Sequence, residues 1–222
     1  MERSAVLFIC LILFAVPAAV YAEGKRPMTI DDLFRFKRVS DPQISPDGKL
    51  VVYVLTTVDL DANKTSSSLW LAPTDKGEPR QLTNTPKKDR HPRWSPDGKQ
   101  ILFESNRSGD NQLWVIDLSG GEARQLTKIS TEASNGICSR DGKRIAFVSA
   151  IYPEYADKPF KESDALNKKR KEEIEKNPVK AKVHKRLFYR HWDSYVEDKR
   201  QHLFVMSADS GEPQPLRLAP TR

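Results

Sequence analysis

Four histidines are the side chains of this 222-residue chain that are best suited to proton transfer or metal binding. They are His91, His184, His191 and His202. None of them is paired with a cysteine, an aspartate or another histidine at the spacing of a metal site, and the zinc-peptidase pattern His-Glu-x-x-His is absent. We therefore expect structural or surface roles for all four, with His91 at the start of a strand.

A nucleophilic serine would be recognisable from its sequence surroundings. In a Gly-x-Ser-x-Gly turn between a strand and a helix, the hydroxyl is exposed beside backbone N–H groups that stabilise an oxyanion. The chain contains no such sequence. Of its two cysteines, Cys10 lies in an N-terminal apolar segment, and Cys138 lies at a strand end, where we expect a buried and unreactive thiol. The sequence thus predicts no catalytic, cofactor-binding or metal-binding residue, and no cofactor.

The first 22 residues predict an export signal. Arg3 supplies a positive charge, residues 5–16 are an apolar run, and Pro17 precedes the small residues of a cleavage site that ends at Ala22. Cleavage would start the mature chain near Glu23 and deliver it to the periplasm or the cell exterior. The alternative is an uncleaved membrane anchor, because residues 5–22 reach the lower length limit of a spanning helix.

Charge is concentrated late in the chain. The formal net charge is +7, and residues 161–190 hold eleven Lys and Arg against five Asp and Glu. Such a patch can bind nucleic acid or an anionic surface. Export argues against nucleic acid as a partner, and the interleaved acidic residues favour a solvated face.

Three copies of one unit occupy most of the remaining chain. The turn sequence Ser-Pro-Asp-Gly stands at residues 45–48 and 95–98, and residues 139–142 repeat it with Arg140 in place of proline. The copies are 50 and 44 residues apart. Proline presets φ at the second turn position and glycine closes the turn, while a type I turn also tolerates arginine there.

Short β-prone segments beside these turns predict four antiparallel strands in each copy. In the second copy the expected strands span about 91–94, 100–105, 111–117 and 123–127. Four-stranded units that repeat every 40–50 residues or so, roughly the spacing seen here, are typical of β-propeller blades. The sequence therefore predicts an all-β fold, in which residues 23–222 form an incomplete propeller. Its three blades are expected at about 41–83, 91–127 and 135–218.

The third copy is interrupted by a basic insertion at about residues 151–200. Ser163 or Asp164 is expected to cap a helix that runs to about Lys176 and stops before Pro178. Oppositely charged residues four positions apart predict three ion pairs on this helix: Lys168–Glu172, Lys169–Glu173 and Glu172–Lys176. We expect a solvated surface excursion, and the alternative is a lid that faces a partner or a substrate.

Two further sets of residues lie within the copies. Trp70, Trp94 and Trp114 fall on predicted strands, where packing between blades is expected. Asn63 and Asn106 begin Asn-x-Ser/Thr patterns in predicted loops. These patterns are glycosylation acceptors only if the source is a eukaryote.

Two stretches resemble a known family. One joins Met-Thr-Ile-Asp-Asp-Leu at residues 28–33 to Arg-Val-Ser-Asp-Pro-Gln-Ile-Ser-Pro-Asp-Gly at 38–48. The other joins Tyr-Arg-His-Trp-Asp at 189–193 to Arg-Gln-His-Leu-Phe-Val at 200–205. Both are similar to the propeller domain of prolyl-oligopeptidase-family serine peptidases, in particular the acylaminoacyl-peptidase and dipeptidyl-peptidase-like branch. The likeness covers roughly residues 28–216.

The resemblance implies a closed propeller that is followed by an α/β-hydrolase domain with a serine, an aspartate and a histidine. In that family the propeller restricts access, so that only short peptides reach the nucleophile. Three blades cannot close a ring, since closed propellers have about four to eight. We therefore expect a fragment of an exported peptidase that lacks the hydrolase domain. Alone it is expected to be catalytically inactive, and its contact with peptide substrates is expected only within the full-length enzyme.

Two other interpretations stay open. The same turns occur in the periplasmic propeller of the Tol system, so the chain could instead be a non-enzymatic binding module of the cell envelope. A three-bladed chain that assembles with copies of itself is the remaining alternative.

Overall fold

The computed structural model describes residues 26–181, 190–192, 194–195, 198–209 and 211–216. It divides into a short N-terminal unit, Met1–Phe34, and a main unit, Arg35–Arg222. The expected export signal and His184 lie outside the described residues. Among the described residues, none of the helices combines the length and apolar character that a membrane crossing requires.

The N-terminal unit contains most of the short helix α2 (Ile30–Arg35). The Asp32 carboxylate accepts hydrogen bonds from the backbone N–H and the hydroxyl of Thr29, at 2.8 and 3.0 Å, and the bond to the N–H is one half of a capping box. Arg26 pairs with the same carboxylate at 2.6 Å. The Met-Thr-Ile-Asp-Asp-Leu stretch is therefore a self-capped helical turn.

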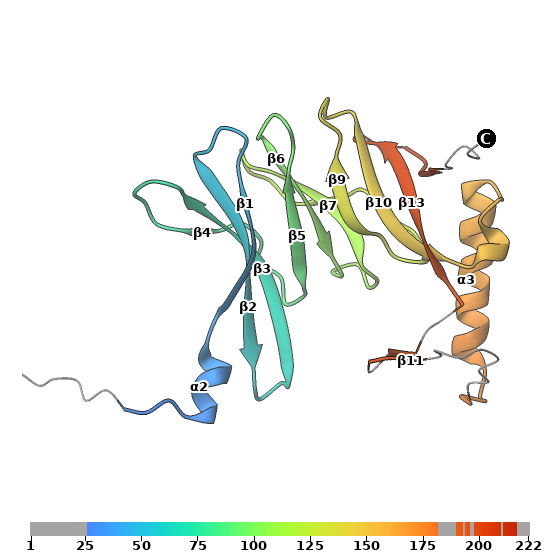
Figure 1. Cartoon of the computed structure of the whole chain (residues 1–222), viewed down its shortest axis with the longest axis horizontal. Helices are drawn as coiled ribbons and strands as arrows, with labels where there is room; N and C mark the ends of the chain where they lie inside the picture. Colours follow the sequence, from blue (N-terminus) through green and yellow to red (C-terminus); the bar gives the residue numbers. More distant parts are fainter. Residues whose placement is uncertain (1–25, 182–189, 193, 196–197, 210, 217–222) are drawn as a thin grey trace, which may run out of the picture. The chain divides into compact units, whose positions relative to one another are not determined.

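The main unit consists chiefly of three four-stranded antiparallel sheets, which confirms the predicted all-β fold (Figure 1). Sheet one is β1 (Arg38–Ile44), β2 (Leu50–Asp59), β3 (Lys64–Pro73) and β4 (Arg80–Gln81). Sheet two is β5 (Asp89–Trp94), β6 (Gln100–Ser105), β7 (Gln112–Asp117) and β8 (Arg124–Gln125). Sheet three is β9 (Ser134–Cys138), β10 (Arg144–Ile151), β13 (Arg200–Ser207) and β14 (Gln214–Pro215). The sheets, called blades one to three below, do not close into a ring within the described residues.

The three repeated turns share one hydrogen-bond pattern. In the first, the Ser45 hydroxyl donates to the Asp47 carboxylate at 2.6 Å and accepts from the backbone N–H of Leu50 at 2.9 Å. Gly48 has φ of 74°, a left-handed conformation that suits glycine. The third turn keeps the same bonds although Arg140 replaces proline, as expected.

Blade two is covered on both faces, and its sequence reflects this. In β6 the five residues 101–105 are all buried, whereas β10 of blade three alternates buried and half-buried residues. Phe103, which is fully buried, packs in the cluster between blades one and two, and Leu102 packs in the cluster between blades two and three. Burial of each such side chain stabilises the fold by about 1.5–3 kcal/mol.

The tryptophan prediction is confirmed for two residues and stays a prediction for the third. Trp94 and Trp114 pack against the core between blades one and two, and Trp94 donates a hydrogen bond to the Gln43 carbonyl at 2.9 Å. Trp70 lies on the opposite face of β3 from the buried Leu69 and Leu71, away from blade two.

The insertion begins with η1 (Pro153–Tyr155) and helix α3 (Phe160–Lys176), and the paired strands β11 (Arg190–His191) and β12 (Ser194–Tyr195) follow. The predicted helix end is right, but the predicted cap is wrong. The helix starts three residues earlier than Ser163, after Pro159, which has no side chain that could cap it. Proline suits this boundary because its fixed φ begins a helix without needing an N–H partner.

Helix α3 is docked on the blades through one face, so it is more than the solvated excursion we expected. Phe160 packs edge-on against Phe204 of blade three, with ring centroids 6.0 Å apart. Asp164 accepts hydrogen bonds from the backbone N–H and the hydroxyl of Ser130, at 2.9 and 2.8 Å. Two of the predicted ion pairs, Lys169–Glu173 and Glu172–Lys176, form on its exposed face.

Candidate binding pocket

The first strand of each blade carries a bulge at the same place in the repeat. One extra residue interrupts the pairing of β1, β5 and β9 with their neighbours. A residue in each bulge has left-handed backbone: φ is 47° at Asp41, 53° at His91 and 54° at Asn135. Aspartate, asparagine and histidine adopt this conformation more readily than other non-glycine residues. Bulges re-aim side chains, and these three are at equivalent positions, 50 and 44 residues apart.

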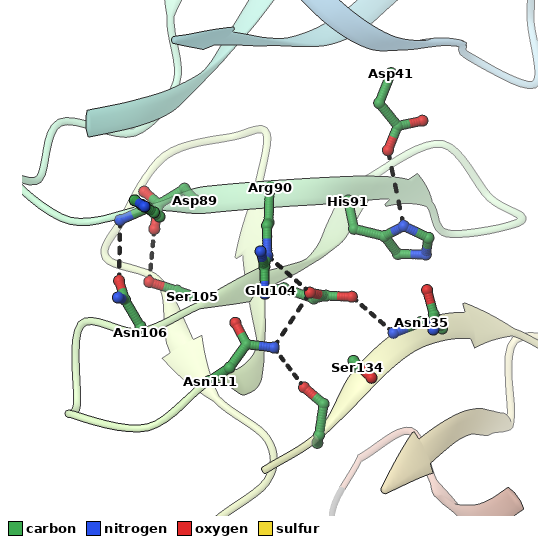
Figure 2. A network of polar contacts seen from close by, with 12 residues as sticks. Asp41, Asp89, Arg90, His91, Glu104, Ser105, Asn106, Asn111, Ser134 and Asn135 are labelled. Atoms are coloured by element: carbon green, nitrogen blue, oxygen red, sulfur yellow. Dashed lines mark hydrogen bonds and ion pairs between the residues drawn. The ribbon is translucent and has the colours of Figure 1, made fainter. Parts of the chain in front are cut away.

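The three bulge residues line one pocket of about 480 Å³. Strand β5 contacts both β1 and β9, so the pocket lies where the first strands of the three blades come together. Arg90 and Glu104 of blade two complete its charged lining. Figure 2 shows these side chains close together; Glu104 comes from β6, and the others come from the first strands of the blades.

Arg93 links blade one to blade two beside the pocket. Its Nη1 donates to both carboxylate oxygens of Asp41, at 3.0 and 2.9 Å, and to the Pro92 carbonyl at 2.7 Å. Its Nη2 lies 3.1 Å from Nδ1 of His91. A guanidinium can only donate, so Nδ1 of His91 is the acceptor and the proton of the neutral imidazole is on Nε2.

His91 is therefore a neutral donor at the pocket. Burial and the nearby charge of Arg93 lower the pKa of His91 from its ordinary value of 6.5, although Glu104 and Asp41 oppose this shift. Asp41 is 3.8 Å from Nδ1 (dashed in Figure 2), too far for a hydrogen bond, and its carboxylate is already neutralised by Arg93. Nε2 is buried and has no hydrogen-bond partner among the described residues.

Glu104 ties blade two to blade three. It is 4% exposed, and its Oε1 accepts from the backbone N–H of Asn135 at 2.6 Å. Its Oε2 accepts from Arg90 Nε and from Asn111 Nδ2, both at 3.1 Å. Figure 2 shows this carboxylate at the centre of the network. A buried carboxylate with these partners is satisfied, and it fixes the bulge of β9 relative to β6.

A second polar cluster within blade two is sealed from the pocket. Asp89 is fully buried, accepts from the Ser105 hydroxyl at 2.6 Å and pairs with Arg107 at 2.8 Å. The Arg107 guanidinium lies over the rings of Phe103 and Trp114, 5.2 and 4.9 Å from their centroids. The Asp89, Ser105 and Arg107 side chains bond one another, so this cluster has a structural role, although Nε1 of Trp114 is buried without a hydrogen-bond partner among the described residues.

The sequence did not single out the place of His91 in a pocket, and its predicted structural or surface role stays a prediction. His91 is the histidine that the fold places in a pocket, while His202 on β13 contacts the backbone carbonyl of Arg200 at 2.9 Å. Asp41, His91 and Asn135 occupy the same place in the repeat, since each lies four residues before the serine that begins the repeated turn. This spacing was the signal available in the sequence.

The other sequence candidates are accounted for individually. Cys138 is half-buried, less than expected, and burial raises the pKa of its thiol, which agrees with low reactivity. The Asn106 side chain accepts a hydrogen bond from the backbone N–H of Lys88 at 3.0 Å. Among the described residues, no group of three or more His, Cys, Asp or Glu side chains could hold a metal ion.

Comparison with known proteins gives the family of these blades. The model of the TolB β-propeller domain matches residues 33–164. The chain belongs to the TolB β-propeller domain family. The match covers blades one and two and the beginning of blade three.

Two proteins with related sequences are named as peptidases. Over 86 residues the chain is 37% identical to the uncharacterised peptidase YuxL of Bacillus subtilis. The aligned stretch covers 39% of this chain and 13% of that protein. Over 85 residues it is 35% identical to dipeptidyl-peptidase 5 of Porphyromonas gingivalis, covering 38% of this chain and 12% of that protein. The chain thus corresponds to propeller sequence of peptidase-family proteins and spans only a small part of their length.

The three-dimensional comparison agrees on the fold. The acylaminoacyl peptidase of Pyrococcus horikoshii matches 80% of this chain and 24% of its own chain, with a TM-score of 0.56 and 20% identity. At that identity the likeness establishes the propeller fold alone.

Proposed function

We propose that this chain is the propeller portion of an exported serine peptidase that acts on oligopeptides. The propeller would restrict which peptides reach a nucleophile carried by a separate hydrolase domain. The observation that carries this proposal is the sequence relationship to two proteins named as peptidases. The described residues form blades and offer no metal cluster, and the sequence has no Gly-x-Ser-x-Gly turn. The bond-breaking residues therefore belong to another part of the full-length polypeptide.

Export is the second part of the proposal. It is supported by Arg3, the apolar run at residues 5–16 and the small-residue site ending at Ala22. N-terminal sequencing of the protein purified from its source tests it. A start at Glu23 supports export with cleavage, while a start at Met1 or Glu2 contradicts cleavage.

The peptidase activity is tested with a fluorophosphonate probe, which labels activated serines. The full-length polypeptide is expected to be labelled, and residues 1–222 expressed alone, which lack the serine turn, are expected to stay unlabelled. Heat-inactivated full-length protein is the control for non-specific reaction. Absence of labelling in correctly folded full-length protein would overturn the peptidase proposal.

A non-enzymatic binding module of the envelope is the second candidate. It is favoured by the family itself, which is described by the TolB propeller. This candidate predicts an unlabelled full-length protein that is recovered from the source together with envelope proteins.

A further inference from the structure

We propose that the pocket at the first strands of the three blades binds the carboxylate of an oligopeptide. This inference rests on the proposed function and names a subsite for its substrate. The peptide carboxylate can come from a free C-terminus or from an acidic side chain, since both present the same acceptor oxygens.

The first reason is an unused donor. Arg93 occupies Nδ1 of His91 at 3.1 Å, which leaves the proton on Nε2. Nε2 is buried without a partner among the described residues and belongs to a side chain that lines the pocket. A buried donor without a partner costs about 1–3 kcal/mol, so a ligand oxygen that reaches Nε2 by displacing the atoms that cover it recovers that energy.

The second reason is the balance of charge. Both carboxylates at the pocket are already matched, Asp41 by Arg93 at 2.9 Å and Glu104 by Arg90 at 3.1 Å. The Arg90 side chain is 55% exposed, and its bond to Glu104 uses only Nε. Its two terminal nitrogens have no hydrogen bond among the described residues. Among the charged and imidazole groups at the pocket, those still available are therefore donors, and they favour an acceptor of negative charge.

The third reason is that the pocket is preorganised. Its volume of about 480 Å³ is within the range of sites for small ligands and admits the end of a peptide rather than a folded chain. His91 and Asn135 are held in bulges, and Glu104 fixes Asn135 through the 2.6 Å bond to its backbone N–H. A ligand would meet donors that are already in place, so little ordering entropy opposes binding.

Three matched peptides test the inference by isothermal titration calorimetry on the purified protein. They are acetyl-Ala-Ala-Ala, its C-terminal amide, and acetyl-Ala-Glu-Ala-amide. We expect the amide of the first peptide to bind at least about tenfold more weakly than the free acid, since one charge-assisted bond is worth at least about 1.4 kcal/mol. The proposal is overturned if neither acetyl-Ala-Ala-Ala nor acetyl-Ala-Glu-Ala-amide binds more tightly than acetyl-Ala-Ala-Ala-amide, or if none of the three binds. Binding by acetyl-Ala-Glu-Ala-amide would support the carboxylate and assign it to an acidic side chain.

Two variants locate the site. His91→Asn keeps a residue that tolerates positive φ but shortens the donor, and it is expected to lose binding by at least about tenfold. His202→Asn removes a histidine on β13 outside the pocket and is expected to bind as the unmodified protein does. If His91→Asn does not fold, NMR spectra of the unmodified protein labelled with ¹⁵N-histidine are recorded instead. The spectrum of His202→Asn then identifies the signals of His202, so that they can be set aside. A ligand-dependent shift of a buried Nε2 supports the site, and unchanged spectra at saturation contradict it.

The outcome separates this inference from the proposed function. Fluorophosphonate labelling of the full-length protein without carboxylate binding would overturn the subsite alone. Carboxylate binding without labelling would keep the subsite and overturn the peptidase.

Discussion

Arg93 of blade two donates two hydrogen bonds to the carboxylate of Asp41 in blade one, at 3.0 and 2.9 Å. The two residues are 52 positions apart in the sequence, and the ion pair is only about one-quarter exposed. It joins two blades that also meet through apolar packing and through the hydrogen bond from Trp94 to the Gln43 carbonyl, and it contacts the imidazole of His91.

Asp41→Asn is expected to destabilise the chain by about 1 kcal/mol, because it replaces a charge-assisted contact with a neutral one. Asparagine keeps the tolerance of positive φ, so backbone strain does not contribute. Urea unfolding measures the change. Asp61→Asn, at an exposed position in the loop between β2 and β3, is the control and should stay within about 0.5 kcal/mol.

Stability should fall as the pH is lowered through the region below 6.5, because of His91. Burial and Arg93 lower the pKa of His91 in the folded state, so the unfolded chain binds this proton more readily. Above pH 6.5 His91 is neutral in both the folded and the unfolded chain, and its full contribution to the free energy of unfolding is present. That contribution is lost as the pH falls through the lowered pKa of the folded state. Urea unfolding at pH 7.5 and 5.5 should show a smaller loss in His91→Asn than in the unmodified chain. An identical loss in both, with His202→Asn as the control, would contradict this role.

The repeated turns should contribute a separate dependence at lower pH. In the second turn, the Ser95 hydroxyl and the backbone N–H of Lys99 lower the pKa of Asp97. A lowered carboxyl pKa gives stability that is present above the unfolded value of about 3.9 and is lost as the pH falls through the folded value. Ser95→Ala should therefore destabilise more at pH 7 than at pH 3 in urea unfolding. Ser207→Ala, an exposed serine on β13, should show no such difference.

Gly136→Ala should destabilise the packing between blades two and three by about 1–3 kcal/mol. A Cβ at Gly136 would lie 2.8 Å from Cδ2 of Leu113, which is fully buried. At Gly211 the nearest atom would be 3.4 Å away, an ordinary contact. Gly211→Ala is therefore the matched control in thermal unfolding. Equal melting temperatures for both variants would mean that Leu113 can move aside freely.

Asn167→Ala should loosen helix α3 from the blades at a cost of about 1–3 kcal/mol. The Asn167 side chain is fully buried, accepts from the backbone N–H of Tyr152 at 3.0 Å and donates to the Ser163 carbonyl at 2.8 Å. Hydrogen exchange of the helix should accelerate in this variant. Asn84→Ala, at an exposed position, should leave the exchange unchanged.

The blades were predictable because local chemistry repeats. The Ser-Pro-Asp-Gly turns, the apolar strands beside them and the end of helix α3 follow from rules that act over a few residues. Blades one and two also share the sequence Gln-Leu-Thr at residues 81–83 and 125–127, and Thr83 and Thr127 each accept a hydrogen bond from a backbone N–H of the neighbouring strand, at 3.0 and 2.9 Å.

The pocket and the docking of helix α3 depend on contacts between distant residues. Asp41 meets Arg93, and Glu104 meets Asn135, only after blades have packed together. The helix begins after Pro159 without a capping side chain, and its first residue, Phe160, contacts Phe204 of the distant strand β13. The spacing of Asp41, His91 and Asn135 was visible in the sequence. The left-handed bulges that bring these three residues to one pocket could not be predicted from it.

Sequencing the source transcript beyond the codon for Arg222 tests the central claim most directly. Our account predicts an open reading frame that continues through further Ser-Pro-Asp-Gly repeats to a Gly-x-Ser-x-Gly turn, with an aspartate and a histidine after it. A stop codon directly after Arg222 would contradict the proposal that this propeller belongs to a peptidase.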